Sequence, residues 1–198
     1  MKSVEALAER ALEYKKKGLT DSEIGDELHL SPETVTWLLS RGIREEAPPK
    51  DVKIGWRSVG VYGARLGHIA NTLTDIIKEE TTRRNVPCDS VLGIVINGIP
   101  LATLVSERLN VELIIYRPSA ERHKGGGAFS SNYATPKGKR VVIVDDVIST
   151  GHTIRAAVED VQEKGGKVIL AVAVVNKTAH DDFDGVPVRS LIRARTLA

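Results

Sequence analysis

Residues 141–153 combine two carboxylates with hydroxyl groups and a glycine, where an expected strand leads into an expected helix. The run Arg140–Val144 indicates a buried strand that ends in Asp145 and Asp146. Backbone amides at the start of the following helix attract anions. Gly151 has no side chain, so the backbone there can approach a phosphate closely. Acids beside an anion need another partner, and vicinal ribose hydroxyls with a magnesium ion nearby would explain them.

The expected phosphate cradle is the polar segment that follows the two acids. A plainer interpretation is also open, in which the acids only end a strand and the hydroxyls only cap the next helix. The length and order of the pattern favour the ligand site. The candidate residues of the cradle are Ser149, Thr150, Gly151, His152 and Thr153.

A second segment with a similar local design precedes the first one. Residues 93–102 follow an expected strand and lead into an expected helix, with Gly98 at the turn. A glycine loop at a helix N-terminus suits a diphosphate group. This signal is weak alone, because many strand–turn–helix units look alike, and its spacing before the acid pair strengthens it. The candidate residues are Ile96, Asn97, Gly98 and Ile99.

The elements that must position these segments alternate between strands and helices. Uninterrupted apolar strands that alternate with helices predict a parallel sheet covered on both faces, an α/β fold. Such sheets bind ligands at the carboxyl ends of their strands. The expected helices are 64–84, 101–109 and 153–164, and the expected strands are 91–96, 111–116, 140–144, 168–175 and 186–192.

The first 47 residues have a different, all-helical pattern that resembles a helix-turn-helix. Thr20–Glu23 forms a capping box, and Ser31 with Pro32 is typical of the start of a third helix. The segment is net acidic, so a packing or dimerisation element of three helices is the alternative. In the DNA-binding interpretation, the last helix enters the major groove. The candidate DNA contacts are Thr34, Thr36, Trp37, Ser40 and Arg41.

Composition and punctuation set the organisation of the chain. Consecutive prolines at 48 and 49 separate an expected helix-turn-helix domain, residues 1–47, from an expected ligand-binding domain, residues 51–198. The net charge of +2 is too small to indicate a polyanion partner by itself. The sequence shows no apolar run of membrane-spanning length and no signal peptide. With Cys88 as the one cysteine, we expect a reducing, cytoplasmic location and an unreactive thiol.

The acid-pair segment resembles the phosphoribosyl pyrophosphate (PRPP) motif of the type I phosphoribosyltransferases, and the earlier loop resembles the pyrophosphate loop of their orotate branch. The resemblance covers about residues 51–192. It implies that Asp145 and Asp146 contact the ribose hydroxyls and that the cradle binds the 5′-phosphate. Magnesium would arrive with PRPP, near the two acids, with no direct protein site. Arg57 and Arg155 match arginines near the base pocket of orotate enzymes.

The flexible loop of these enzymes departs from the family pattern in this chain. Anchored on Arg117, the alignment places His123 on the family histidine, Pro118 on the first loop lysine and Glu121 on the catalytic lysine. An acid at that position repels a polyanion, so the resemblance implies binding without efficient turnover. If the loop register slides, the candidate catalytic residues are Arg122 and Lys124.

The order of helix-turn-helix followed by an orotate-transferase-like domain resembles archaeal transcription regulators of that description. The resemblance implies a homodimer that binds promoter DNA, with PRPP or a related nucleotide as effector and magnesium as its companion ion. Two alternatives stay open. One is a working orotate phosphoribosyltransferase with a helical extension, and the other is a purine-base transferase or its regulator.

Overall fold

The computed structural model describes residues 4–40, 49–119 and 127–195. The chain divides into two compact units. One comprises residues 1–55 with 195–198, and the other comprises residues 56–194. The division falls a few residues after the prolines that the sequence marks as a boundary.

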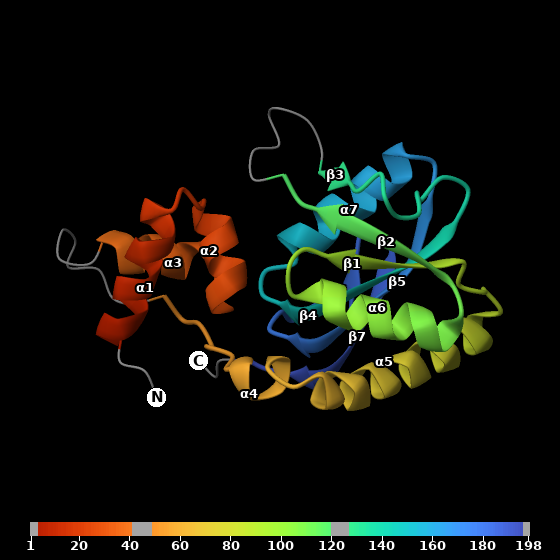
Figure 1. Cartoon of the computed structure of the whole chain (residues 1–198), viewed down its shortest axis with the longest axis horizontal. Helices are drawn as coiled ribbons and strands as arrows, with labels where there is room; N and C mark the ends of the chain where they lie inside the picture. Colours follow the sequence, from red (N-terminus) through yellow and green to blue (C-terminus); the bar gives the residue numbers. More distant parts are fainter. Residues whose placement is uncertain (1–3, 41–48, 120–126, 196–198) are drawn as a thin grey trace. The chain divides into compact units, whose positions relative to one another are not determined.

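The first unit is a cluster of three helices, α1 (Val4–Lys16), α2 (Asp21–Leu28) and α3 (Pro32–Ser40) (Figure 1). The predicted capping box is present at α2, where the Glu23 amide donates to Thr20 Oγ1 and the Thr20 amide donates to Glu23 Oε2. These bonds satisfy amides that a helix start leaves without partners. The buried core of the unit consists of Ala11, Ile24, Leu28, Leu30, Val35 and Leu38.

The tight turn between α2 and α3 explains the small residue at position 25. A Cβ atom on Gly25 would lie 2.8 Å from the carbonyl oxygen of Leu30. The Leu30 amide in turn donates to the Gly25 carbonyl at 2.9 Å. Contact with the backbone of the turn therefore requires the glycine.

The second unit is built on a seven-stranded sheet with the order β3-β2-β1-β4-β5-β7-β6. The five central strands pair in parallel, and β3 and β6 pair antiparallel at the two edges. This confirms the predicted α/β class. The strands are β1 (Ser90–Ile94), β2 (Glu112–Arg117), β3 (Ala128–Phe129), β4 (Arg140–Ile148), β5 (Lys167–Asn176), β6 (Asp182–Phe183) and β7 (Val186–Arg193).

Helices cover both faces of this sheet (Figure 1). The second unit contains α4 (Arg57–Gly60), α5 (Gly63–Arg84), α6 (Gly98–Leu109) and α7 (His152–Glu163). On one face, α7 packs with Leu92 and Ile143 through Ile154 and Val158 in a single buried cluster. On the other face, α6 lies against β1 and β4, and α5 packs against α6 and β5. Burial on both faces explains why the strands read as uninterrupted apolar runs.

Two details of the second unit differ from the sequence prediction. Strand β4 continues to Ile148, so the two acids lie within the strand rather than beyond its end. The extension exists because Val147 and Ile148 keep pairing with β5, which local apolar pattern does not reveal. The short elements α4, β3 and β6 were not predicted, because segments of two to four residues carry no periodic signal.

Candidate functional site

The acid pair lies at the centre of the parallel sheet, near the carboxyl end of β4. Asp146 is 3% exposed, and its Oδ1 accepts a hydrogen bond from the Val147 amide at 2.7 Å. Asp145 is half-buried, and its Oδ1 accepts from the Asp146 amide at 2.9 Å. These backbone bonds hold both carboxylates in place at the edge of the sheet where ligands of α/β proteins bind.

The expected cradle follows directly and leads into α7. Gly151 is the N-cap of this helix and has a φ of +85°, a conformation that glycine adopts readily. The Oγ atom of Ser149 is buried and has no hydrogen-bond partner among the described residues. A buried hydroxyl without a partner is costly, so this atom is suited to an acceptor that the protein itself does not supply.

The structure brings the second predicted segment against the first. A Cβ atom on Gly98, the first residue of α6, would lie 2.7 Å from the Val144 carbonyl oxygen and 3.1 Å from Asp145 Oδ1. The helix start that suits a diphosphate is therefore adjacent to the acid pair. Before it, Ile96 is 64% exposed, and the Val95–Ile96 peptide bond is cis.

Phe183 packs against the cradle at Gly151, and the sequence analysis did not identify this residue. Its side chain is fully buried on β6, and a Cβ atom on Gly151 would lie 2.5 Å from the ring. The tight β6–β7 turn holds the ring there, since the Gly185 amide donates to Asp182 Oδ1 at 2.9 Å. The pair Asp184-Gly185 is a turn signal that marks this hairpin in the sequence, although it does not reveal the contact with residue 151.

The two candidate base-pocket arginines are far from equivalent in their surroundings. The Arg155 guanidinium hydrogen-bonds to Asp184, and it lies 4.9 Å from the centre of the Phe183 ring. Its charge is therefore already balanced by a carboxylate of the same chain. Arg57 is exposed at the start of α4. The predicted contact of Arg57 and Arg155 with a base stays a prediction.

Most of the predicted flexible loop falls outside the described residues. Arg117 is exposed at the end of β2. The candidates Arg122, His123 and Lys124 lie within residues 120–126, which the structure does not describe. Their roles stay predictions from the sequence.

The expectation that Thr34 faces outward for DNA is wrong. Thr34 is 8% exposed, and its hydroxyl donates to Asp51 Oδ2 at 2.9 Å. Helical period alone suggested an outward side chain, and the period does not reveal a hydrogen bond to a residue 17 positions later.

The other candidate DNA contacts on α3 have mixed surroundings. Thr36 is exposed and donates to Asp21 Oδ2 at 2.9 Å. Trp37 is half-buried against the helical core, and Ser40 donates to the Trp37 carbonyl at 3.2 Å. Arg41 lies outside the described residues.

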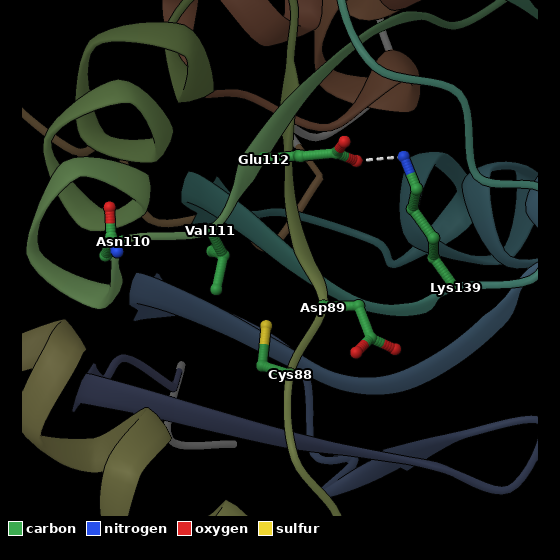
Figure 2. Close-up of a pocket in the computed structure, with 6 residues that line it drawn as sticks. All are labelled: Cys88, Asp89, Asn110, Val111, Glu112 and Lys139. Atoms are coloured by element: carbon green, nitrogen blue, oxygen red, sulfur yellow. Dashed lines mark hydrogen bonds and ion pairs between the residues drawn. The ribbon is translucent and has the colours of Figure 1, made fainter.

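A shallow depression lies at the opposite edge of the sheet, beside the amino ends of β1, β2 and β4 (Figure 2). Its charged side chains are paired, Lys139 with Glu112 and Asp89 with Arg140. Burial raises the pKa of the Cys88 thiol to about 11, so the sulfur stays protonated at neutral pH. A protonated thiol agrees with the expectation of an unreactive cysteine. The depression lies at the amino ends of the strands, whereas the acid pair lies near the carboxyl end of β4.

From the ion pair between Asp89 and Arg140 we predict a specific loss of stability in acid. Its hydrogen bond from the Arg140 side chain lowers the pKa of Asp89 from 3.8 to about 2. A lowered folded-state pKa contributes stability that is complete above about pH 4 and lost as pH falls through about pH 2. We expect Asp89→Asn to abolish this part of the pH dependence in urea unfolding. Parallel curves for the two proteins between about pH 4 and pH 2 would contradict it.

Comparison with known proteins extends over both units. A family model described as phosphoribosyl transferase domain matches residues 64–192. A protein of Thermoplasma acidophilum named transcriptional regulator GfcR is 55% identical over 197 residues, which cover 100% of this chain and 98% of the relative. The namesake from Picrophilus torridus is 50% identical over 193 residues, covering 98% of each chain.

The chain belongs to the GfcR family of transcriptional regulators. The GfcR relatives match the three N-terminal helices as well as the sheet, because the aligned regions span nearly the whole chain. The predicted family of archaeal regulators with a phosphoribosyltransferase-like domain is thereby confirmed.

Solved structures show the fold of the larger unit. An orotate phosphoribosyltransferase from Aeropyrum pernix aligns with a TM-score of 0.58 at 21% identity, covering 74% of this chain and 81% of that one. An adenine phosphoribosyltransferase from Thermoanaerobacter pseudethanolicus aligns with a TM-score of 0.60 at 21% identity, covering 76% and 92%. Enzymes for two different bases share the fold, so the likeness confirms the type I architecture and no base preference.

Two further findings concern the described part of this GfcR-family chain. No helix in it is long and apolar enough to cross a membrane. In the same ranges, no group of three or more His, Cys, Asp and Glu side chains is arranged to hold a metal ion.

Proposed function

We propose that this chain is a DNA-binding regulator whose larger unit binds PRPP as an effector. The observation that carries the ligand assignment is the buried Ser149 Oγ without a partner, located between the acid pair and the start of α7. A phosphate oxygen would accept from this hydroxyl and from the amides of the first helical turn. The remaining cradle residues Thr150, Gly151, His152 and Thr153 complete the phosphate site in this proposal.

The rest of PRPP would extend from the cradle toward α6. Asp145 and Asp146 would accept from the ribose hydroxyls, and the start of α6 at Gly98 would face the diphosphate. Magnesium would accompany PRPP, since a diphosphate near two carboxylates offers the oxygen ligands that this ion prefers. The ion would supply charge neutralisation between the acids and the diphosphate.

The DNA-binding part of the proposal rests on the first unit. In this proposal α3 reads the major groove through Thr36, Trp37 and Ser40, and Arg41, the next residue in the sequence, adds a contact. A homodimer would present two such helices to half-sites about 34 Å apart, one turn of DNA. We also propose a cytoplasmic location, because the genomic DNA of a cell without a nucleus lies in the cytoplasm.

We infer little or no catalytic turnover. The sequence has Pro118 and Glu121 where orotate enzymes place loop lysines, and an acid there disfavours the charge of a departing pyrophosphate. In addition, Arg155 is engaged by Asp184. Pyrophosphate release from PRPP with orotate is the direct assay, and rapid turnover would replace the regulator with the enzyme alternative.

The function is tested by capture of genomic DNA. Fragments of the source genome are passed over the full-length protein with and without PRPP and magnesium, at a stated salt concentration. We expect a few fragments that share an inverted repeat to be retained, with a yield that PRPP changes. Equal retention of all fragments in both conditions would overturn the proposal and favour a packing role for the helices.

Ser149 offers a sharp test of the ligand site, because the chain contains a matched control. Ser90, at the opposite edge of the sheet, is the other buried hydroxyl without a partner among the described residues. A hydrogen bond to a charged group contributes about 1.5–3 kcal/mol, so Ser149→Ala should weaken PRPP binding roughly 10- to 100-fold in titration calorimetry. Ser90→Ala should leave the affinity unchanged. If both variants bound PRPP with equal affinity, Ser149 would not belong to the ligand site.

A further inference from the structure

The segment that connects the two units returns to the helix-turn-helix and binds both sides of its turn. Asp51 Oδ2 accepts from the Ser31 amide at 2.7 Å and from the Thr34 hydroxyl at 2.9 Å, at the start of α3. Lys53 Nζ donates to the Leu28 carbonyl at 2.5 Å, at the end of α2. We call these contacts of Asp51 and Lys53 the linker clasp.

The caps of α2 and α3 differ in where their second half comes from. At α2, Thr20 is the N-cap, and Glu23 in the same helix accepts from the Thr20 amide at 2.9 Å. At α3, Ser31 accepts from the Thr34 amide at 3.2 Å, which is the equivalent first half. Thr34 stands where α2 has its glutamate, and its hydroxyl donates to Asp51. The carboxylate that completes the box therefore comes from the linker.

Charge and position make the clasp favourable in the engaged state. A carboxylate at the N-terminus of α3 and an ammonium at the C-terminus of α2 both complement the helix dipoles. The two contacts flank the turn of residues 29–31, which sets the orientation of α3 relative to α2. Since Asp51 also accepts from its own neighbour Val52, the linker backbone is held in the same arrangement.

We propose that the linker clasp is the element through which PRPP binding changes DNA binding, with Asp51 as the coupling residue. This inference rests on the proposed function. The linker continues from Lys53 to Trp56, the first residue of the larger unit, so a shift of Trp56 would be transmitted along the backbone first to Lys53 and then to Asp51. With Asp51 engaged, both halves of the capping box at α3 are formed, and α3 is held beside α2. With Asp51 withdrawn, the Ser31 amide loses its acceptor and the orientation of α3 is released.

The test measures one ratio in the full-length protein. This is the affinity for a captured DNA fragment with PRPP and magnesium, divided by the affinity without them. Allosteric couplings typically amount to about 5- to 150-fold. We expect Asp51→Ala to bring this ratio to about 1 while PRPP affinity stays that of the wild type. Lys53→Met, which keeps the aliphatic stem, should also move the ratio toward 1.

Thr20→Ala is the matched control, because it breaks the self-contained cap of α2 in the same unit and leaves the linker alone. If Asp51 served only as a structural cap, Asp51→Ala and Thr20→Ala would both weaken DNA binding equally with and without PRPP, and the ratio would persist. A persistent ratio in Asp51→Ala and Lys53→Met overturns the inference and leaves the proposed function standing. A wild-type ratio of 1 overturns both.

Should Asp51→Ala fail to fold, Lys53→Met and Asp51→Asn carry the same test. The asparagine keeps an oxygen that can accept from the Ser31 amide and loses the charge. The coupling ratio in these variants must then lie closer to 1 than that of the wild type, and an unchanged ratio in both rejects the clasp.

Discussion

Replacing Gly151 by alanine is expected to reduce PRPP binding by about two orders of magnitude. The glycine has a φ of +85°, and an added Cβ would lie 2.5 Å from the Phe183 ring. The left-handed conformation costs an L-residue about 1–2 kcal/mol, and overpacking typically costs about 1–3 kcal/mol more. If about 3 kcal/mol is relieved by moving the cradle away from its ligand-binding position, the affinity falls about 100-fold.

Gly138→Ala separates the two causes. Gly138 also has a positive φ, +71°, but an added Cβ would meet nothing within 4 Å. It should lose about 1 kcal/mol of unfolding free energy through its backbone conformation and bind PRPP with unchanged affinity. Titration calorimetry and urea unfolding measure both quantities. A Gly151→Ala protein that binds PRPP within threefold of the wild type would show that Phe183 does not shape the cradle.

Replacing Asp160 by alanine is expected to lower the unfolding free energy by about 3 kcal/mol. Asp160, on α7, is 8% exposed, and its Oδ2 accepts from the Tyr116 hydroxyl and from the Gly127 amide, each at 2.6 Å. Tyr116 is fully buried on β2. Removing one buried acceptor deprives two donors at once, and each loss costs about 1–3 kcal/mol. The contact joins α7 to the backbone that follows residues 120–126.

Tyr116→Phe is the companion variant for Asp160. It removes one donor and leaves the Gly127 amide bonded to the carboxylate, so a smaller loss of about 1 kcal/mol is expected. The double variant measures how far the two effects overlap, because residues in one network are not additive. Urea unfolding of the four proteins decides the matter. A loss below about 0.5 kcal/mol in Asp160→Ala, the range of ordinary surface substitutions, would contradict the network.

Features that depend on neighbours along the chain could be predicted from the sequence. The capping box at Thr20 forms between residues three positions apart. The strand, the acid pair and the glycine of residues 141–153 follow one another along the chain, so their order predicted a ligand site at the carboxyl end of β4. The apolar runs predicted a parallel sheet covered on both faces, since burial on both sides removes the alternation of polar residues. The type I fold and the regulator family followed from these motifs and were confirmed.

Features that depend on distant contacts were decided by the tertiary structure alone. Phe183 meets Gly151 across 32 positions of the chain, and Asp51 accepts from the Thr34 hydroxyl across 17 positions. The extra residues of β4 exist because β5 continues beside them. Helical period and strand pattern describe which side of an element is apolar, whereas a hydrogen bond or a ring contact depends on which other segment folds against that side. For this reason the sequence alone predicted the acid pair at the end of a buried strand and the N-terminal helices, and only the folded chain showed that Phe183 packs against Gly151 and that Asp51 binds the start of α3.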